Sequence, residues 1–128
     1  MCVANSARSQ LAEGLAKSLF SSDTEIQSAG SRPSQVSPLA IEAMKEIGID
    51  ISKNFSKSIE ELPPKFLSDL DYVVTLCAEE TCPVFVSKAK KLHWPMPDPG
   101  CYHALSDFRT TREAIKTKLL EFKKELSQ

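Results

Sequence analysis

One stretch decides the fold of this chain: Cys2-Val3-Ala4-Asn5-Ser6-Ala7-Arg8-Ser9. Five residues separate a cysteine from an arginine, a serine follows, and an amphipathic run begins directly afterwards. Backbone N–H groups of such a loop can surround a tetrahedral oxyanion, and the following helix points its positive end at the same place. A loop of this kind normally follows a strand of a parallel α/β sheet. The stretch therefore predicts both an architecture and an anion site.

The residue types in this loop predict a nucleophile with its supporting groups. A free thiol has a pKa near ~8.5, and only the thiolate is a good nucleophile. Loop amides, the helix N-terminus and Arg8 would each lower the pKa of Cys2, while the hydroxyl of Ser9 can donate to the thiolate. The planar fork of Arg8 matches two oxygens of a phosphate-like anion. We expect Asn5 to adopt a left-handed turn, which asparagine tolerates. The alternative is a chance pairing of cysteine and arginine on a surface loop.

Length and composition indicate one globular domain, residues 1–128, with 41% hydrophobic and 26% charged residues. A net charge of −1 gives no reason to expect nucleic acid or an anionic membrane as a partner. No apolar run approaches the ~18 residues of a membrane span, and no secretory signal is visible, so we expect a cytoplasmic protein. In that compartment, four cysteines indicate a nucleophile, redox chemistry, metal ligands or buried apolar residues.

Helical and strand patterns alternate along the chain and predict a doubly wound α/β sheet. Helices are expected over residues 9–20, from Ser37-Pro38 to a stop at Gly48, and along a C-terminal stripe of Phe108, Ile115, Leu119, Phe122 and Leu126. Strands are expected over residues 24–28, 71–76 and 91–94. Only Met1 precedes Cys2, so we expect the strand that should lead into the loop to be absent or truncated.

The run Cys2-Val-Ala-Asn-Ser-Ala-Arg-Ser-Gln-Leu-Ala-Glu-Gly resembles the phosphate loop of the low-molecular-weight tyrosine phosphatase superfamily, and within it the thioredoxin-coupled arsenate reductases. The resemblance continues at Ser28-Ala29-Gly30, Ser37-Pro38, Val74-Thr75-Leu76-Cys77, His93-Trp94 and Asp98-Pro99. It implies a three-layer α/β/α fold with a four-stranded parallel sheet in the order 2-1-3-4. The absent strand would be the first, a central one. The loop residues Val3, Ala4, Asn5, Ser6, Ala7 and Arg8 would then bind the substrate anion.

Cys77 and Cys82 distinguish reduction from hydrolysis. A phosphatase needs one cysteine, whereas reduction needs two electrons and hence further thiols. The resemblance implies that Cys2 attacks arsenate and that Cys77 attacks Cys2 to form a Cys2–Cys77 disulfide. Cys82 would then produce a Cys77–Cys82 disulfide for thioredoxin to reduce. Incidental thiols are one alternative; a zinc site with Cys101 and His103 is another, although the spacing fits zinc poorly.

Asp98, between two prolines, resembles the family's general acid, which protonates the departing oxygen. Its alternative is a plain turn aspartate. Cys101 and His103 match no required family residue, and we expect both to be bystanders.

Some family members hold a potassium ion, and Asn5, Glu13 and Ser28 match three of its ligand positions. At the fourth position this chain has Lys57, whose ammonium could replace the cation. We therefore predict no potassium requirement and no other cofactor; the alternative is a solvated surface lysine.

Together these features predict a cytoplasmic, monomeric arsenate reductase that serves arsenic detoxification and takes its electrons from thioredoxin. The catalytic residues would be Cys2, Arg8, Ser9, Cys77, Cys82 and Asp98. A phosphotyrosine or phosphomonoester phosphatase is the first alternative, and a catalytically silent oxyanion-binding or partner-binding module is the second. Glutaredoxin or another thiol could replace thioredoxin.

Overall fold

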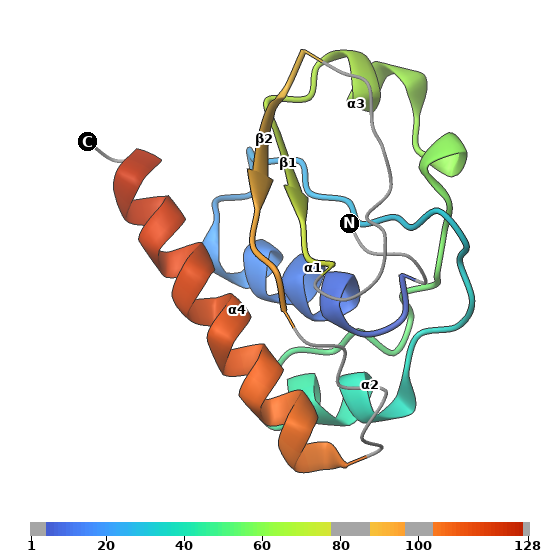
Figure 1. Ribbon diagram of the computed structural model, residues 1–128, viewed down its shortest axis with the longest axis vertical. Coiled ribbons are helices and arrows are strands. Elements are labelled where there is room, and N and C mark those ends of the chain that lie inside the picture. Colours follow the sequence, from blue (N-terminus) through green and yellow to red (C-terminus); the bar gives the residue numbers. More distant parts are fainter. Residues whose placement is uncertain (1–4, 78–87, 97–103, 127–128) are drawn as a thin grey trace.

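A computed structural model describes residues 5–77, 88–96 and 104–126 of the chain. The described elements are α1 (Arg8–Leu19), α2 (Pro38–Lys45), a 3-10 turn η1 (Ile59–Glu61), α3 (Pro64–Ser68), β1 (Tyr72–Thr75), β2 (Lys90–His93) and α4 (Leu105–Leu126). Figure 1 shows the long α4 crossing one side of the molecule, with α1 and α2 beside it and α3 at the far end of the strands.

β1 and β2 form a parallel pair in which Tyr72 lies opposite Lys90 and Thr75 opposite His93. The pairing continues past the strands, because Met96 N–H donates to the carbonyl of Leu76 at 3.1 Å. The parallel pair occurs with four α-helices in the described chain, and Phe122 of α4 packs against Tyr72 of β1, which confirms the α/β class. In the described part of the chain the sheet has these two strands.

Most predicted elements are present, with ends shifted by one or two residues. The helix expected over 9–20 is α1, and the strands expected over 71–76 and 91–94 are β1 and β2. α2 begins, as expected, with Ser37 before Pro38. Gly48 has a φ of 78° and closes this helix, since its N–H donates to Lys45 and that of Ile49 to Met44.

The strand predicted over Thr24–Ser28 is wrong, because these residues form no strand. A short β-prone segment becomes a strand only when a neighbour supplies a ladder. Here Ser28 N–H donates instead to the side chain of Glu13 at 2.8 Å, and the next contact is one isolated parallel bridge from Gly30 to Ser58.

The core lies where α1, α2 and α4 meet. Its largest buried side chains include Leu11 and Leu15 of α1, Met44 of α2, and Phe108 and Ile115 of α4. The predicted stripe on α4 is confirmed for Phe108, Ile115 and Leu119, whereas Leu126 is 46% exposed beside an open groove.

Gly14 allows α1 to approach its neighbours closely. A Cβ atom at this position would lie 2.8 Å from Met44 Cε and 2.9 Å from Ile51 Cγ2. In the described residues, no helix is both long enough and apolar enough to cross a membrane.

Candidate active site

The described half of the loop turns at Asn5 and runs straight into α1. Asn5 has a φ of 49° and is fully buried, which confirms the predicted left-handed turn. The loop is also tied to the start of α2, because Ser37 N–H donates to the carbonyl of Ser6 at 3.0 Å. Cys2, Val3 and Ala4 lie outside the described residues.

Hydrogen bonds hold both ends of the Asn5 amide. Its Nδ2 donates to Ser9 Oγ at 2.7 Å, and its Oδ1 accepts from Lys57 N–H and Gln10 Nε2, both at 3.0 Å. The backbone carbonyl of Asn5 accepts from Ser56 Oγ at 2.6 Å. A residue in a strained conformation persists when its surroundings determine it this closely. The loop geometry is therefore built into the fold.

Ser9 lies in the first turn of α1 and is 1% exposed. Because its Oγ accepts from Asn5, the hydroxyl keeps its own proton to donate elsewhere. That is the role expected for a group that stabilises a thiolate from the helix N-terminus.

Arg8 joins the loop to the carboxyl ends of both strands. The guanidinium is buried, and its Nη1 donates to the carbonyls of Met96 at 3.0 Å and Leu76 at 3.3 Å. Ligands bind at this end of a parallel sheet. These two bonds fix the orientation of the planar fork, so the cation that would bind an oxyanion is preorganised.

Cys77 lies two residues after the end of β1 and one residue beyond the carbonyl that Arg8 binds. Its side chain is buried, with 1% of its surface exposed. The structure thus places Arg8 and Cys77 at the carboxyl ends of the strands, with Ser9 next to Arg8 in the first turn of α1. Cys82, Asp98, Cys101 and His103 lie outside the described residues, so their expected roles and the zinc alternative stay predictions.

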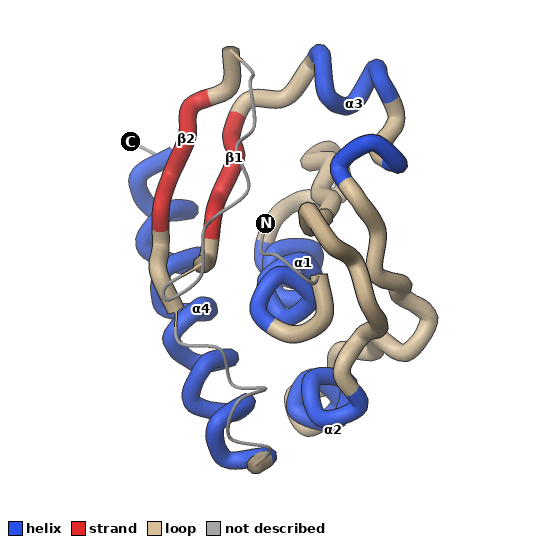
Figure 2. Tube along the Cα trace, turned by 45° about the vertical axis from the view of Figure 1, so that its right-hand side comes forward, coloured by secondary structure: helices blue, strands red, loops and turns tan. Residues whose placement is uncertain are grey.

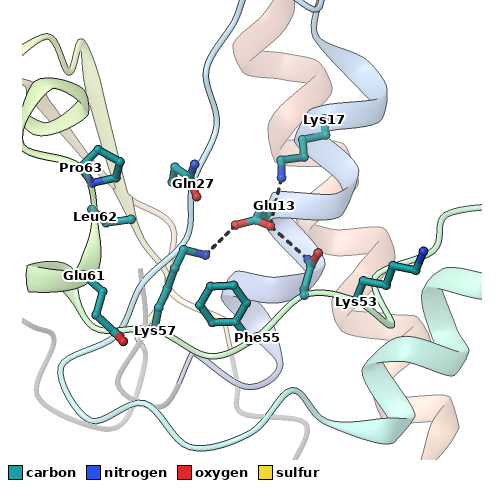
Figure 3. A pocket seen from close by; sticks show the side chains of 10 residues that line it. Glu13, Lys17, Gln27, Lys53, Phe55, Lys57, Glu61, Leu62 and Pro63 are labelled. Carbon is teal, nitrogen blue, oxygen red and sulfur yellow. Dashed lines mark hydrogen bonds and ion pairs between the residues drawn. The ribbon is translucent and has the colours of Figure 1, made fainter.

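A polar cluster around Glu13 lies behind the loop and lines a pocket of about 320 Å³ (Figure 3). The Oε1 atom of Glu13 accepts from the amide and hydroxyl of Ser28, each at 2.8 Å, and lies 3.3 Å from Lys57 Nζ. Its Oε2 accepts from Asn54 Nδ2 at 3.0 Å and from Lys17 at 3.3 Å. Lys57 is only 8% exposed, so it is not a solvated surface lysine.

The charge of Glu13 is stabilised by its neighbours. Burial alone would raise the pKa of this carboxyl, but the hydrogen bond from Ser28 and the ammonium groups of Lys57 and Lys17 outweigh that effect and hold its pKa below the usual value. Glu13 is therefore a carboxylate at neutral pH, and Lys57 is its buried counter-ion.

Sequence reasoning missed Gln10, Asn54 and Ser56, which support the loop. Gln10 is fully buried and donates to the backbone and side chain of Asn5, and it accepts from Asn54 Nδ2 at 3.1 Å. The sequence offered one signal for Gln10. This residue lies directly before the apolar face of α1, where an amide side chain can point inward. Nothing local in the sequence links residues 54–56 to Asn5.

The chain matches known arsenate reductases over almost its whole length. A protein from Staphylococcus haemolyticus named arsenate reductase 2 is 42% identical over 125 residues, which cover 96% of this chain and 92% of that protein.

Solved structures of arsenate reductases also superpose on this chain. An arsenate reductase in the phosphate binding state superposes with a TM-score of 0.79 at 35% identity, covering 94% of this chain and 91% of the other. A thioredoxin-dependent arsenate reductase from Corynebacterium glutamicum has a TM-score of 0.75 at 31% identity, covering 99% of this chain and 60% of that one.

A family model described as low molecular weight phosphotyrosine protein phosphatase matches residues 1–128. With Arg8 binding carbonyls at the carboxyl ends of two parallel strands, the chain belongs to the low molecular weight phosphotyrosine protein phosphatase family.

Proposed function

We propose that this chain reduces arsenate to arsenite and that thioredoxin returns it to the dithiol state. One observation carries the proposal: a buried cysteine, Cys77, lies one residue beyond the carbonyl that anchors the Arg8 guanidinium. Hydrolysis has no use for a second thiol at this position, whereas reduction requires one. The arsenate reductase names of relatives at 42% and 35% identity support the same reaction.

In the first step, the Cys2 thiolate attacks arsenate and forms an As–S bond. A hydroxyl group of arsenate leaves as water with a proton from Asp98. Arg8 and the amides at the start of α1 stabilise the charge on the remaining oxygens. The hydroxyl of Ser9 donates a hydrogen bond to the thiolate before the attack and so stabilises its charge.

The next steps move two electrons from sulfur to arsenic. The Cys77 thiolate attacks the Cys2 sulfur, an S–S bond forms, and the As–S bond breaks with its electron pair staying on arsenic, which leaves as arsenite. Cys82 then attacks Cys77, releases Cys2 and leaves a Cys77–Cys82 disulfide. The two thiols of thioredoxin reduce this disulfide and become oxidised.

Phosphomonoester hydrolysis is the second candidate, favoured by the phosphatase family match. The loop and Arg8 bind tetrahedral anions without distinguishing arsenic from phosphorus by shape. We therefore expect a weak phosphatase activity at the same site. The third possibility, a silent oxyanion-binding module, would bind phosphate with neither activity.

The deciding experiment compares Cys77→Ser with a Cys101→Ser control. Each variant is assayed for arsenate reduction with thioredoxin and for hydrolysis of p-nitrophenyl phosphate. We expect Cys77→Ser to lose reduction and keep hydrolysis, because only reduction uses a second thiol, while Cys101→Ser keeps both. An unchanged rate of arsenate reduction by Cys77→Ser would contradict the proposed cysteine relay. A wild-type chain that binds phosphate but performs neither reaction would favour the silent module.

The Lys57–Glu13 pair supports a further part of the proposal, namely that the enzyme needs no potassium. The Lys57 ammonium lies 3.3 Å from Glu13 Oε1 and supplies the positive charge. At equal ionic strength, KCl and NaCl should give the same reduction rate and unfolding midpoint. A higher rate or midpoint in KCl alone would contradict this role.

The remaining parts of the proposal concern the setting of the reaction. We place the enzyme in the cytoplasm, where thioredoxin keeps thiols reduced, and expect one domain, residues 1–128, acting as a monomer. The four-stranded order 2-1-3-4 stays an expectation from the family resemblance, because the sheet in the described residues consists of β1 and β2.

A further inference from the structure

The hydrogen bonds behind the loop have a direction, and it begins at Glu13. This carboxylate is ionised, so it can only accept hydrogen bonds. The atom of Asn54 that lies 3.0 Å from Glu13 Oε2 must therefore be the amide nitrogen, Nδ2. The same nitrogen also donates to Gln10, at 3.1 Å. The Gln10 atom that accepts this bond must be the amide oxygen, Oε1.

This contact turns the amide nitrogen of Gln10 toward the loop. Nε2 lies 3.2 Å from the carbonyl of Asn5, 3.0 Å from Asn5 Oδ1 and 3.3 Å from the carbonyl of Phe55. Backbone carbonyls can only accept, so the two ends of the Gln10 amide require the same orientation. The side chain is fully buried, and these protein groups replace water as its partners.

Gln10 links the start of α1 to a segment that is distant in sequence. Figure 2 shows the chain between α2 and η1 passing α1 on the side away from α4. This segment carries Asn54 and Phe55, which lie 44 and 45 residues from Gln10. Both contact the amide of Gln10, so one side chain holds this segment and the loop residue Asn5 together.

The direction of the hydrogen bonds continues through Asn5 to Ser9. Asn5 Oδ1 accepts from Gln10 Nε2 and from the N–H of Lys57. The other end of this amide, Nδ2, therefore faces Ser9 and donates to its Oγ at 2.7 Å. The hydroxyl of Ser9 must then donate its own hydrogen bond to a different acceptor. In the proposed function that acceptor is the Cys2 thiolate.

We propose that Gln10 is a positioning residue for the nucleophile: through Asn5 it directs the Ser9 hydroxyl toward the Cys2 thiolate and so increases the fraction of thiolate at neutral pH. Without the amide of Gln10, Asn5 loses one of the two donors that hold Oδ1 away from Ser9. A reversed Asn5 amide would accept from the Ser9 hydroxyl and take that hydrogen bond from the thiolate. This role rests on Cys2 being the nucleophile of the proposed function, and it is the same for arsenate and for a phosphate ester.

The test measures the ionisation of the Cys2 thiol itself. The full chain is treated with iodoacetamide between about pH 4 and pH 9, and peptide mass spectrometry counts the alkylation of Cys2. Gln10→Met keeps the length of the side chain but has no amide. We expect this variant to move the pH midpoint of alkylation up by about one pH unit, because a hydrogen bond to a charged group is lost.

The control separates positioning from stability. Ile115→Val removes a methyl group from a fully buried position of α4. We expect it to lower the unfolding midpoint and to keep the wild-type pH midpoint of alkylation. A glutamine with only a structural role would behave in the same way, so Gln10→Met and Ile115→Val would then differ only in stability.

A second variant decides the question if Gln10→Met does not fold. Asn54→Ala removes the donor that orients the Gln10 amide, at a position that is only partly buried. We expect a smaller shift of the pH midpoint in the same direction. A wild-type midpoint in every variant that folds would overturn the proposal, and so would a wild-type chain with a midpoint near ~8.5, the value of an ordinary thiol. The expected shift in a chain that reduces no arsenate would contradict only the proposed reduction.

Discussion

Arg8 is the residue in which fold and chemistry are tied together most directly. One guanidinium nitrogen is held by two carbonyls, those of Leu76 and Met96, from segments far apart in the sequence. The same cation is expected to bind the substrate anion. A single side chain therefore both orients the loop and supplies its charge.

Replacing Arg8 by lysine keeps the charge but loses the planar fork and its fixed direction. We expect kcat/KM for arsenate to fall by roughly 10²–10³-fold, and hydrolysis of p-nitrophenyl phosphate to fall in parallel. Steady-state kinetics of both reactions measure this. Arg32→Lys, an exposed site, is the control and should match the wild type. Activity of Arg8→Lys within about threefold of the wild type would mean that the fork is not needed.

Glu13 makes stability depend on pH. Because folding lowers the pKa of Glu13 below its ordinary value, the ionised carboxylate stabilises the fold at pH values above that ordinary value. This stabilisation is lost as the pH falls through the lower folded pKa. We expect Glu13→Gln to lower the free energy of unfolding at pH 7 by about 2 kcal/mol, since Lys57 loses its buried partner.

The difference between wild type and Glu13→Gln should shrink below about pH 4, which urea unfolding at several pH values would show. Glu60→Gln, an exposed carboxyl in η1, is the control. A difference that stays constant from pH 7 to pH 3 would show that Glu13 acts through shape and not through charge.

At the scale of elements, α1 organises the molecule. Its first turn holds the loop, Glu13 in its middle binds the Ser28 segment, and its apolar face reaches α2 and α4. The close approach to α2 depends on Gly14. This packing fixes the position of the loop relative to the Glu13 cluster.

We expect Gly14→Val to destabilise the protein by roughly 2–4 kcal/mol, because its side chain must displace Ile51 and Met44 from a packed interface. Thermal and urea unfolding would measure the change. Lys118→Val, on an exposed position of α4, is the control and should cost only the small difference in helix propensity between lysine and valine. An equal loss of unfolding free energy in both variants would show that the packing of α1 against α2 does not depend on Gly14.

At the scale of the whole molecule, the proposed cysteine relay needs a second protein, thioredoxin, as its source of electrons. Each turnover must move two electrons from thioredoxin through Cys82 and Cys77 to arsenate. The relay therefore predicts a stoichiometry as well as a rate.

Cys82→Ser should release at most one arsenite per chain and then stop, because its Cys2–Cys77 disulfide has no internal thiol to open it. Counting arsenite against enzyme in a quenched reaction measures this, and non-reducing mass analysis should find the trapped disulfide. Cys101→Ser should turn over many times. Repeated turnover by Cys82→Ser with thioredoxin alone would remove Cys82 from the relay.

Local patterns in the sequence were enough for much of the fold and part of the site. The helix N-terminus at Ser37-Pro38, the stop at Gly48 and the turn at Asn5 were all predicted correctly. Each depends on the backbone preferences of one or two residues, which the sequence states directly. The roles of Cys2, Cys82 and Asp98 came from spacing and resemblance and stay predictions.

The sequence by itself determined which chemical groups this chain carries and, within a few residues, where α1 and α2 begin and end, because spacing and local backbone preference act over a few residues. Only the tertiary structure decided that Lys57 is buried against Glu13 and that Arg8 donates to carbonyls at the ends of both strands. It also decided that Thr24–Ser28 borders a groove instead of joining the sheet. These outcomes depend on partners that are 15 to 88 residues apart in sequence. Such contacts form when packing brings distant segments together, which no local pattern encodes.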